Sequence, residues 1–410
     1  MALVAIEYRE LTVDDYEQAA RLESRAFYNR PSAEMIERMR QYFPPEWTVG
    51  AFVDGRLVAD VRTVPQVRRM HGATMAFGAV GPVASEAAFR RQGYAARLLT
   101  LSLERMRERG QVLSGLHTPH DALYQRYGWE RAEFKKRLKF RPKDIRLRFR
   151  SSGGRTAPAT GDDWERLAAV FRERTQSRNG PFVRNEVWWR EAVLKHWDAG
   201  NTIDSDAVVW VDADGRDAGY MVYFEHTMES QIRWQAHGVF IRDFQALTAN
   251  AYLGLWEHML THDLADSIVT EAHPDDPFQQ LCEDPFKIEV SRGSEGAMLR
   301  IVDVEKALAM RPSVSTRAAG FTARIEDRSL AWNDGTWWIE AAEGRTSAER
   351  TDAEADVEMS VNTLASLFTG YLKPETAAES GFIRVNRTEA VAEMAQVFAV
   401  TDPPFCPDYY

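Results

Sequence analysis

The residues best placed to do chemistry form a short basic loop, RRQGYAA, at positions 90–96. A glycine here lets the main chain approach a ligand closely, and the first turn of a helix presents N–H groups that lack partners. Arginine adds charge and can meet a phosphate with two parallel hydrogen bonds. The loop therefore predicts a phosphate-binding site. A solvated helix start with two arginines stays the alternative, because short glycine motifs recur by chance.

The elements around this loop are the ones that must position it. An apolar strand is expected to end near Val83, and a helix with apolar periodicity is expected over 95–109. Upstream, the run 47–64 contains an Asp-Gly pair between two apolar stretches, which predicts a β-hairpin. Downstream, a strand is expected at 112–116, followed by a helical turn that carries Tyr124. This order predicts a mixed α/β domain and not a dinucleotide-binding fold, which needs a richer glycine fingerprint.

Length and composition limit the possible classes of protein. A chain of 410 residues is expected to hold two or three domains, and 44% hydrophobic with 27% charged residues is typical of soluble globular proteins. No apolar run approaches the roughly 20 residues that a membrane span needs. The net charge of −10 argues against wholesale nucleic-acid binding. Two cysteines, Cys282 and Cys406, make no disulfide framework, so we expect a cytoplasmic location.

The rest of the chain divides into further units. A linker is expected at 151–158, and the second unit after it repeats the strand and helix order of the first. Its strand-to-helix junction, expected at 241–246, has no glycine and carries an acid, so this unit is predicted to be a scaffold without the ligand loop. A third unit is expected from about Val302. The tail 401–410 contains three prolines, which favour an extended chain, and it ends with two tyrosines.

The order of elements and the loop together resemble the GNAT acetyltransferase superfamily. Its acetyl-CoA pyrophosphate loop follows the pattern Gln/Arg-x-x-Gly-x-Gly/Ala, which Arg90, Gly93 and Ala95 meet. The whole chain is similar to the Eis (enhanced intracellular survival) family within that superfamily. The resemblance implies an α/β (α+β) fold with three domains. These are a catalytic GNAT domain at 1–150, a degenerate GNAT-like domain at 151–300, and a sterol-carrier-protein-like domain at 301–410.

The resemblance also implies an activity, the transfer of the acetyl group of acetyl-CoA to a primary amine by direct attack, with no metal. The positions that match the family's acetyl-CoA contacts are Val83, Ala84, Ser85, Arg91, Gln92, Gly93, Tyr94, Ala95, Ala96, Pro119 and His120. Tyr124 matches the family's general acid, which protonates the departing CoA thiolate. A phenol with a pKa near 10 is protonated at neutral pH and can donate.

The family's general base is the terminal carboxylate, which here belongs to Tyr410. An α-carboxyl has a pKa of about 3.5 and an amine one of about 10, so this proton transfer is uphill in water. Either desolvation raises the pKa of the carboxylate, or the carboxylate orients an amine that is already deprotonated. The bland alternatives are a core tyrosine at position 124 and a disordered tail.

The amine acceptor is the least constrained expectation. The resemblance implies aminoglycosides or lysine side chains as acceptors, and a homo-hexamer as the assembly. However, the helix segment 22–27 is expected to face the substrate, and its Arg25 would repel a polycation. Ser24 stands where better-known members of the family carry an acid. Glu23 can replace that acid only if its side chain faces the pocket. The alternative function is a non-catalytic scaffold that binds CoA and lipid. A metal site at His117 and His120 is disfavoured, because no third ligand stands at suitable spacing.

Overall fold

The computed structural model of the chain describes residues 5–27, 33–198, 201–228, 236–292 and 297–409. These residues form two compact units, each continued by a later part of the chain. The first unit combines residues up to Glu133 with Ala297–Pro404, and the second combines Phe134–Gly296 with Phe405–Tyr409. Within the described residues, every helix is too short or too polar to cross a bilayer.

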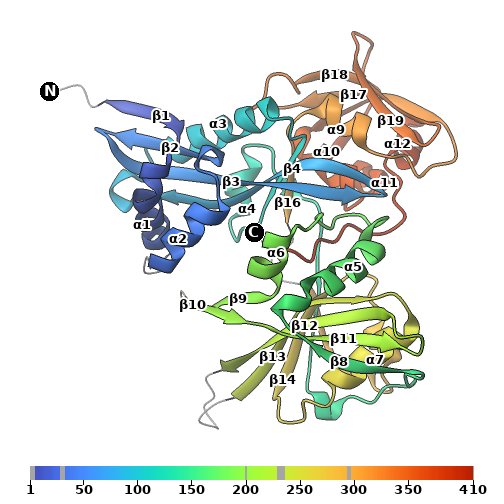
Figure 1. The fold of residues 1–410 in the computed structure, drawn as a ribbon. Helices are drawn as coiled ribbons and strands as arrows, with labels where there is room; N and C mark the ends of the chain where they lie inside the picture. Colours follow the sequence, from blue (N-terminus) through green and yellow to red (C-terminus); the bar gives the residue numbers. More distant parts are fainter. Residues whose placement is uncertain (1–4, 28–32, 199–200, 229–235, 293–296, 410) are drawn as a thin grey trace. The chain divides into compact units, whose positions relative to one another are not determined.

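Among the described residues, the main sheet of the first unit has seven strands in the order β1-β2-β3-β4-β5-β16-β6 (Figure 1). Their bounds are β1 (Ile6–Glu10), β2 (Thr48–Val53), β3 (Arg56–Met70), β4 (Ala73–Ser85), β5 (Leu113–Leu116), β16 (Met298–Ile301) and β6 (Glu130–Arg131). All neighbours are antiparallel except β4 and β5, which are parallel. The hairpin predicted at 47–64 is confirmed as β2 and β3.

Helices cover both faces of this sheet. On one face, α1 (Tyr16–Ala26) packs into a cluster with Leu57 and Ala84, and α2 (Ala33–Tyr42) follows it. On the other face, α3 (Tyr94–Glu108) packs against Val80, with Val83 at the margin of the cluster. Successive strand side chains point to opposite faces, so neighbouring residues of β4 belong to different cores. The helix predicted at 95–109 is confirmed as α3.

The second unit repeats this arrangement with its own sheet, β15-β7-β14-β13-β12-β11-β8. Its strands are β7 (Lys136–Phe140), β8 (Gly154–Ala159), β11 (Asp206–Asp212), β12 (Asp217–Met228), β13 (Ala236–Ala246), β14 (Ser267–Ala272) and β15 (Glu289–Arg292). Its two long helices are α5 (Trp164–Thr175) and α7 (Ala249–Met259). The strands β13 and β14 are parallel, as β4 and β5 are in the first unit. The predicted duplication of the scaffold is confirmed.

Two local predictions for this unit were wrong. The second half of the linker at 151–158 is strand β8, in which Gly154 is required because a Cβ there would meet the Trp210 ring at 2.5 Å. The junction at 241–246 is the end of strand β13 and not a loop. Between them, the Trp-rich segment 184–198 contains α6 (Glu186–Trp188), a π-turn, and strand β9 (Lys195–Asp198), which pairs with β10 (Asn201–Asp204).

Each of the two main sheets is completed by a strand from another part of the chain. Strand β7 follows the part of the chain that forms most of the first sheet, but it joins the sheet of the second unit beside β14. Strand β16 follows the second stretch but joins the sheet of the first unit beside β5. The domain ranges 1–150, 151–300 and 301–410 stay predictions.

The C-terminal part of the first unit has a five-stranded sheet of described residues in the order β19-β18-β17-β20-β21. The strands are β17 (Ala319–Glu326), β18 (Gly335–Ala342), β19 (Arg345–Arg350), β20 (Val357–Ser360) and β21 (Ile383–Val385). The helices are α9 (Val304–Met310), α10 (Val361–Thr369), α11 (Pro374–Glu379) and α12 (Ala390–Val397). Ser360 caps α10, because its side chain accepts a hydrogen bond from the N–H of Thr363.

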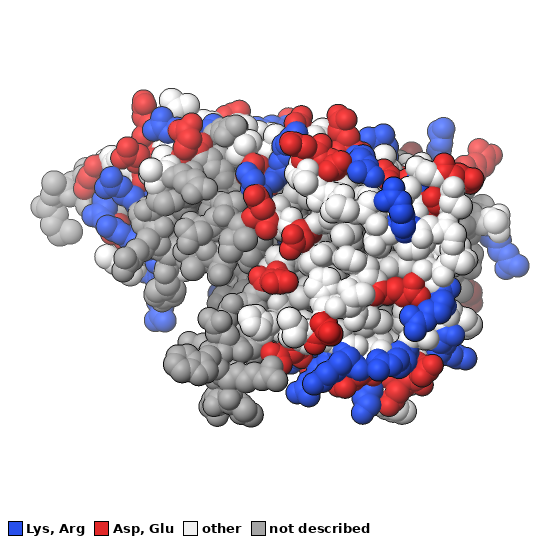
Figure 2. Space-filling model, turned by 60° about the horizontal axis from the view of Figure 1, so that its bottom comes forward, with Lys and Arg blue, Asp and Glu red and all other residues white. Residues whose placement is uncertain are grey.

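The charges on the surface balance locally. Figure 2 shows one face, on which Lys and Arg side chains lie interspersed with Asp and Glu around an area that carries no charged residue. The net charge of −10 is therefore not gathered into a single patch on this face.

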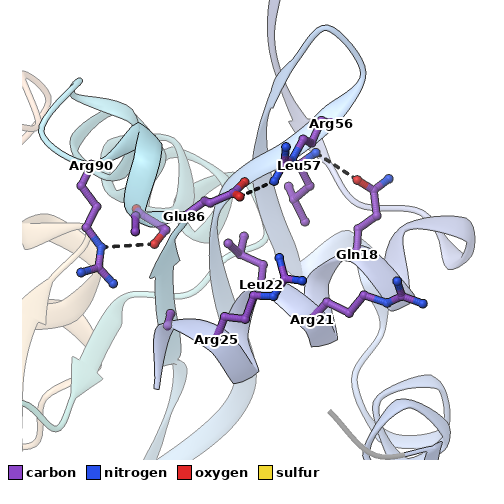
Figure 3. Close-up of a pocket in the computed structure, with 11 residues that line it drawn as sticks. Gln18, Arg21, Leu22, Arg25, Arg56, Leu57, Glu86 and Arg90 are labelled. Carbon is purple, nitrogen blue, oxygen red and sulfur yellow. Dashed lines mark hydrogen bonds and ion pairs between the residues drawn. The ribbon is translucent and has the colours of Figure 1, made fainter. Parts of the chain in front are cut away.

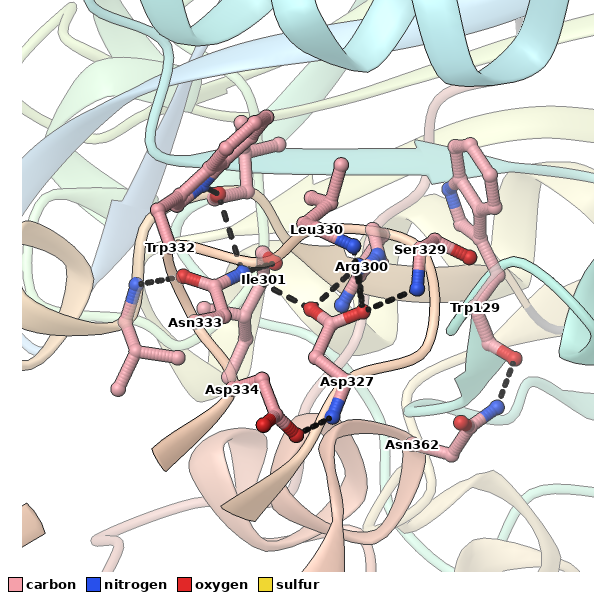
Figure 4. A network of polar contacts seen from close by, with 12 residues as sticks. Trp129, Arg300, Ile301, Asp327, Ser329, Leu330, Trp332, Asn333, Asp334 and Asn362 are labelled. Atoms are coloured by element: carbon pink, nitrogen blue, oxygen red, sulfur yellow. Dashed lines mark hydrogen bonds and ion pairs between the residues drawn. The ribbon is translucent and has the colours of Figure 1, made fainter. Parts of the chain in front are cut away.

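A buried polar network ties strand β16 to the C-terminal part of the first unit (Figure 4). The guanidinium of Arg300 is fully buried and donates to both carboxylate oxygens of Asp327, at 2.8 and 2.6 Å. Asn333 donates to Asp327 at 3.0 Å and to the carbonyls of Ile301 and Val302 at 3.3 and 3.2 Å. Because a buried charge is costly when it loses its partner, Arg300 cannot move freely.

This fixed guanidinium leaves no room for a side chain at position 128. Gly128 has a φ of +88°, and a Cβ there would lie 2.6 Å from Cζ of Arg300. Gly110 has a φ of +78°, but no atom lies within 4 Å of its Cβ position. Both Gly→Ala changes cost about 1 kcal/mol of backbone strain. Gly128→Ala should cost about 1–3 kcal/mol more, because Arg300 must be displaced.

The midpoints of thermal unfolding of the two variants check this. We expect a clearly larger decrease for Gly128→Ala than for Gly110→Ala. Equal decreases would show that Arg300 yields without cost.

Candidate active site

The centre of the candidate site is the place where β4 separates from β5. The two strands pair only from Phe77 with Leu113 to Ala79 with Gly115, while β4 continues to Ser85. On its other side β4 stays paired with β3 from Ala73 to Ser85, interrupted only at Gly81 and Pro82. The last part of β4 therefore has one edge without a partner strand among the described residues.

The direction of the peptide groups along this edge follows from the pairing with β3. The N–H of Glu86 donates to the carbonyl of Val58 at 2.9 Å. Because successive peptide groups of a strand point to opposite sides, those of Val83 and Ser85 face away from β3. An extended ligand chain can add to such an edge like another strand.

A β-bulge explains why the strands part here. Val61 and Thr63 of β3 pair with Val83 and Val80, so β4 holds one extra residue between these pairs. This stretch of β4 is Gly81-Pro82, and proline is tolerated at a bulge because the ladder hydrogen bond is already lost. A bulge bends its strand, which turns the end of β4 away from β5.

The basic loop comes shortly after the end of β4 and leads into helix α3, whose N-terminus has no side-chain cap. Arg91 and Gly93 both have left-handed backbone conformations, with φ of +63° and +86°, and both are exposed. Gly93 is the N-cap of α3 and supplies no side chain to it, and the first helical bond runs from the N–H of Arg97 to the carbonyl of Gly93 at 3.1 Å. The N–H groups of Tyr94, Ala95 and Ala96 therefore lack acceptors within the helix. This start of α3 suits an anion.

The loop is anchored by one aromatic side chain. Tyr94 is buried in the core under α3, and its ring lies 6.5 Å from that of Phe89. Tyr94 thereby also holds its neighbours in sequence, Gln92, Ala95 and Ala96, which are predicted contacts of the co-substrate.

The segment after β5 leaves the sheet at the same end as the basic loop after β4, because the two strands are parallel. Pro119 and His120 are exposed there, and the N–H of His120 donates to Oγ1 of Thr118 at 2.9 Å. Helix α4 (Asp121–Gln125) begins at the next residue and carries Tyr124.

Tyr124 lies at the border between the core and the open edge. Its ring packs edge-on to that of Trp129 at 6.3 Å, and both Tyr124 and Val83 contact the core cluster under α3. Burial raises the pKa of the Tyr124 phenol above its usual value of 10. No described residue hydrogen-bonds its hydroxyl, which leaves the proton available for donation.

Sequence reasoning missed the support of this turn by α10. Nδ2 of Asn362 donates to the carbonyls of Gln125 and Trp129, both at 3.0 Å, and Figure 4 shows the second contact. Oγ of Ser366 donates to the carbonyl of Arg131 at 2.6 Å, and Oγ1 of Thr369 donates to that of Ala132 at 2.7 Å. A polar side chain at the start of an apolar helix was the only signal in the sequence.

A second feature missed from the sequence is a buried charge cluster beside Ala84. Asp60 pairs with Ala84 across the strands and is fully buried, and Glu23 of α1 forms an ion pair with Arg62. Burial, together with the Glu23 carboxylate, raises the pKa of Asp60 well above its ordinary value. Glu23 is only 2% exposed, and Ser24 is also buried, so the Glu23 carboxylate faces the core and not an open pocket. An acid inside an apolar strand was the signal that could have pointed to it.

The second unit shows what the same scaffold does without a ligand loop. Only two residues separate β13 from α7, and Thr248 caps the helix by accepting a hydrogen bond from the N–H of Ala251 at 3.1 Å. Asp243, which the sequence placed in a loop, lies on β13 and pairs with Arg184 and Tyr220. The helix start of this unit is therefore closed to an anion.

The chain's own tail is held in the second unit. The N–H of Phe405 donates to the carbonyl of Asn179 at 2.9 Å. Asp408 accepts hydrogen bonds from Nε of Arg184 at 2.8 Å and from Nε1 of Trp188 at 2.7 Å. The side chain of Arg184 is only 1% exposed. Burial alone would lower the pKa of Arg184, but the carboxylates of Asp243 and Asp408 raise it.

Tyr409 lies where β13 and β14 part. Their pairing ends at Ile241 with Thr270, and Tyr409 contacts the next residue of each strand. Its hydroxyl donates to Glu271, and the Arg242 guanidinium lies 5.0 Å from its ring centre. Tyr410, the predicted general base, lies outside the described residues.

Among the described residues, no group of His, Cys, Asp or Glu side chains is arranged to hold a metal ion. The residues around the β4 edge fit a phosphorylated, extended ligand better, because they combine a strand edge without a described partner strand, an uncapped helix start and arginine side chains.

Comparison with protein families agrees with this arrangement. Residues 7–132 and 180–301 each match an acetyltransferase (GNAT) domain family, and residues 304–407 match a sterol carrier protein domain family. GNAT domains use acetyl-CoA as co-substrate.

Curated relatives match along nearly the whole chain. An uncharacterized N-acetyltransferase of Streptomyces griseus is 26% identical, and the match covers 99% of this chain and 100% of the relative. The N-acetyltransferase Eis of Mycobacterium tuberculosis is 24% identical, and the match covers 85% of this chain and 83% of the relative.

Solved structures share the fold. A probable N-acyltransferase from Enterococcus faecalis superposes with a TM-score of 0.87 at 21% identity, over 99% of this chain and 100% of the other. Eis1 from Mycobacterium abscessus superposes with a TM-score of 0.81 at 23% identity, again over 99% and 100%. The chain is therefore a GNAT acyltransferase similar to the Eis N-acetyltransferases, and it joins two GNAT domains to a sterol carrier protein domain.

Proposed function

We propose that the chain transfers the acetyl group of acetyl-CoA to a primary amine, and that the first unit binds acetyl-CoA along the free edge of β4. The carrying observation is the separation of β4 from β5 directly before an uncapped, arginine-bearing helix start. An unpaired strand edge suits an extended amide chain, and the helix start suits a pyrophosphate.

The proposed contacts follow this geometry. The peptide groups of Val83 and Ser85, which face away from β3, pair with the pantetheine and polarise the thioester oxygen, and Ala84 lies between them on the strand. The pyrophosphate lies against the segment 91–96, where the first N–H groups of α3 and the Arg91 guanidinium meet it. Pro119 and His120 line the other side of the opening, since they follow the neighbouring strand.

The proposed chemistry is a single displacement. The amine nitrogen attacks the thioester carbonyl, a C–N bond forms and the C–S bond breaks. Tyr124 donates its proton to the departing thiolate, and the amine gives up a proton to the carboxylate of Tyr410. Exchange of protons with solvent then restores both groups. The raised pKa of Tyr124 keeps the phenol protonated in the resting enzyme.

The proposed role of the tail is compatible with its order up to Tyr409, because Asp408 and Tyr409 are each held by buried or charged partners. The acceptor would be an aminoglycoside-like or lysine-like amine. The hexameric assembly and the cytoplasmic location stay predictions.

The sterol carrier protein domain favours one second candidate. In that case the chain would bind CoA and lipid as a scaffold without turnover. Saturable lipid binding, with no release of CoA in the presence of any amine, would support the scaffold.

The assignment of Tyr124 can be tested by its removal. Tyr124→Phe keeps the ring packing on Trp129 but removes the proton, so kcat for CoA release should fall about a hundredfold or more. The KM for acetyl-CoA should stay close to that of the wild type, because the loop 91–96 is untouched. A chain that lacks only Tyr410 should also lose kcat. Equal rates in all three proteins would end the catalytic assignment.

The pH profile gives an independent check. A general acid must be protonated, so activity is lost as the pH rises through its pKa. Because burial raises the pKa of Tyr124, the alkaline decrease of wild-type kcat should lie above about pH 10, the value for a free phenol. This alkaline decrease should disappear in Tyr124→Phe.

The support of the Tyr124 turn by α10 predicts a positioning role for Asn362. Asn362→Ala leaves the carbonyls of Gln125 and Trp129 without their donor, which should lower kcat about tenfold by loosening the turn. The KM for acetyl-CoA should not change.

Asn386→Ala is the matched control, because Asn386 donates to the carbonyl of Ala355 in the same domain without touching the turn. Steady-state CoA release by both variants gives the comparison. A similar kcat for the two variants, or a raised KM in Asn362→Ala, would contradict the positioning role.

A further inference from the structure

A pocket of about 320 Å³ lies beside the end of β4, on the face of the sheet that α1 covers (Figure 3). It is bounded by α1, by the start of β3, and by the residues from Ser85 to the beginning of the basic loop. Leu22 and Leu57 give it an apolar wall, and Ser85 is shared with the proposed acetyl-CoA edge. The volume suits an amino-acid-sized group.

The pocket is rich in arginine. Arg21 and Arg25 come from α1, Arg56 from the start of β3 and Arg90 from the loop, against a single lining carboxylate, Glu86. Side chains from three separate elements thus bring like charges to one concavity. Like charges repel at short range, so this arrangement is unfavourable unless something neutralises it.

Two of these charges are neutralised within the protein. Glu86 forms an ion pair with Arg56, and Glu17 pairs with Arg21 at 3.4 Å on the exposed side of α1. Arg25 and Arg90 have no carboxylate partner among the described residues. Nε of Arg90 donates only to the carbonyl of Ser85, at 3.4 Å. The pocket therefore holds two guanidinium groups without a carboxylate partner among the described residues, although the net charge of the protein is −10.

We propose that this pocket binds an oxyanion, carboxylate or phosphate, separately from the pyrophosphate held at the start of α3. The ligand group meets Arg25 and Arg90, since guanidinium groups match both oxyanions with paired hydrogen bonds. The inference deepens the proposed function and rests on it.

Two molecules could supply the anion. One is an acceptor amine that carries its own carboxylate, such as an amino acid or the end of a peptide. The other is a phosphate of acetyl-CoA outside the pyrophosphate. The pocket volume and the apolar wall of Leu22 and Leu57 favour the acceptor. A polycationic acceptor such as an aminoglycoside would be repelled by Arg25 and Arg90. Of the two proposed acceptor classes, the pocket therefore favours the lysine-like amine, on a molecule that also carries an anionic group.

The test compares the full-length wild type with Arg25→Gln and with Arg328→Gln, which removes an exposed arginine far from the pocket in sequence. The two acceptors are Nα-acetyl-lysine and its amide, which share one ε-amine but differ in the carboxylate. The two donors are acetyl-CoA and acetyl-dephospho-CoA. Binding is also measured by calorimetry, so that it does not depend on turnover.

If the acceptor supplies the anion, the wild type should prefer the carboxylate over the amide. Arg25→Gln should weaken that preference about fivefold, the upper range for one solvent-exposed ion pair. If the donor supplies it, Arg25→Gln should raise the KM for acetyl-CoA and leave that for acetyl-dephospho-CoA unchanged.

The proposal is overturned if Arg25→Gln behaves like Arg328→Gln with both acceptors and both donors. Failure of the proposed function gives a different result. In that case no amine is acetylated by the wild type, while an Arg25-dependent preference in calorimetry would still support the anion site.

Discussion

The edge of β4 that has no partner strand among the described residues is the constraint on which the site depends. Beyond the Ala79–Gly115 pair, the peptide groups of Val83 and Ser85 face a gap in place of a neighbouring strand, and main-chain N–H and C=O groups need hydrogen-bond partners. The Gly81-Pro82 bulge creates the gap, and the loop and helix start that follow add donors and positive charge at its mouth. An extended chain that ends in phosphates would satisfy all of these groups together, which is the basis for proposing acetyl-CoA at this edge.

The second unit supports the same reasoning, because it shares the scaffold but satisfies its groups internally. Its parallel strands also part, beyond Ile241 and Thr270, yet Thr248 caps the following helix and Tyr409 packs against Arg242 and Glu271. In the second unit the gap between the parallel strands is therefore filled by a residue of the chain's own C-terminal segment. The C-terminal domain has a comparable structural role, since α10 holds the turn that carries Tyr124.

Local patterns in the sequence predicted the hairpin, the strand before the loop, helix α3 and the repeated scaffold, because each depends on residues close in sequence. The predictions failed where distant residues decide the structure. Gly154 suggested a linker but is a strand residue under Trp210, and no local pattern could reveal the exchange of β7 and β16. The contacts of Asn362 with the Tyr124 turn span more than 230 residues and could not be predicted either.

The most direct test of the account is the affinity for acetyl-CoA when the backbone of the loop is changed at one position. Gly93→Ala should relax out of the left-handed conformation in the free protein and must regain it on binding, at about 1–2 kcal/mol, so the Kd should rise about tenfold. Gly72→Ala is the control, because Gly72 has a similar φ of +92° in the β3–β4 turn with open space around it. Its Kd should match that of the wild type. Calorimetric titration that gives the same Kd for both variants would contradict the claim that the uncapped start of α3 holds the co-substrate.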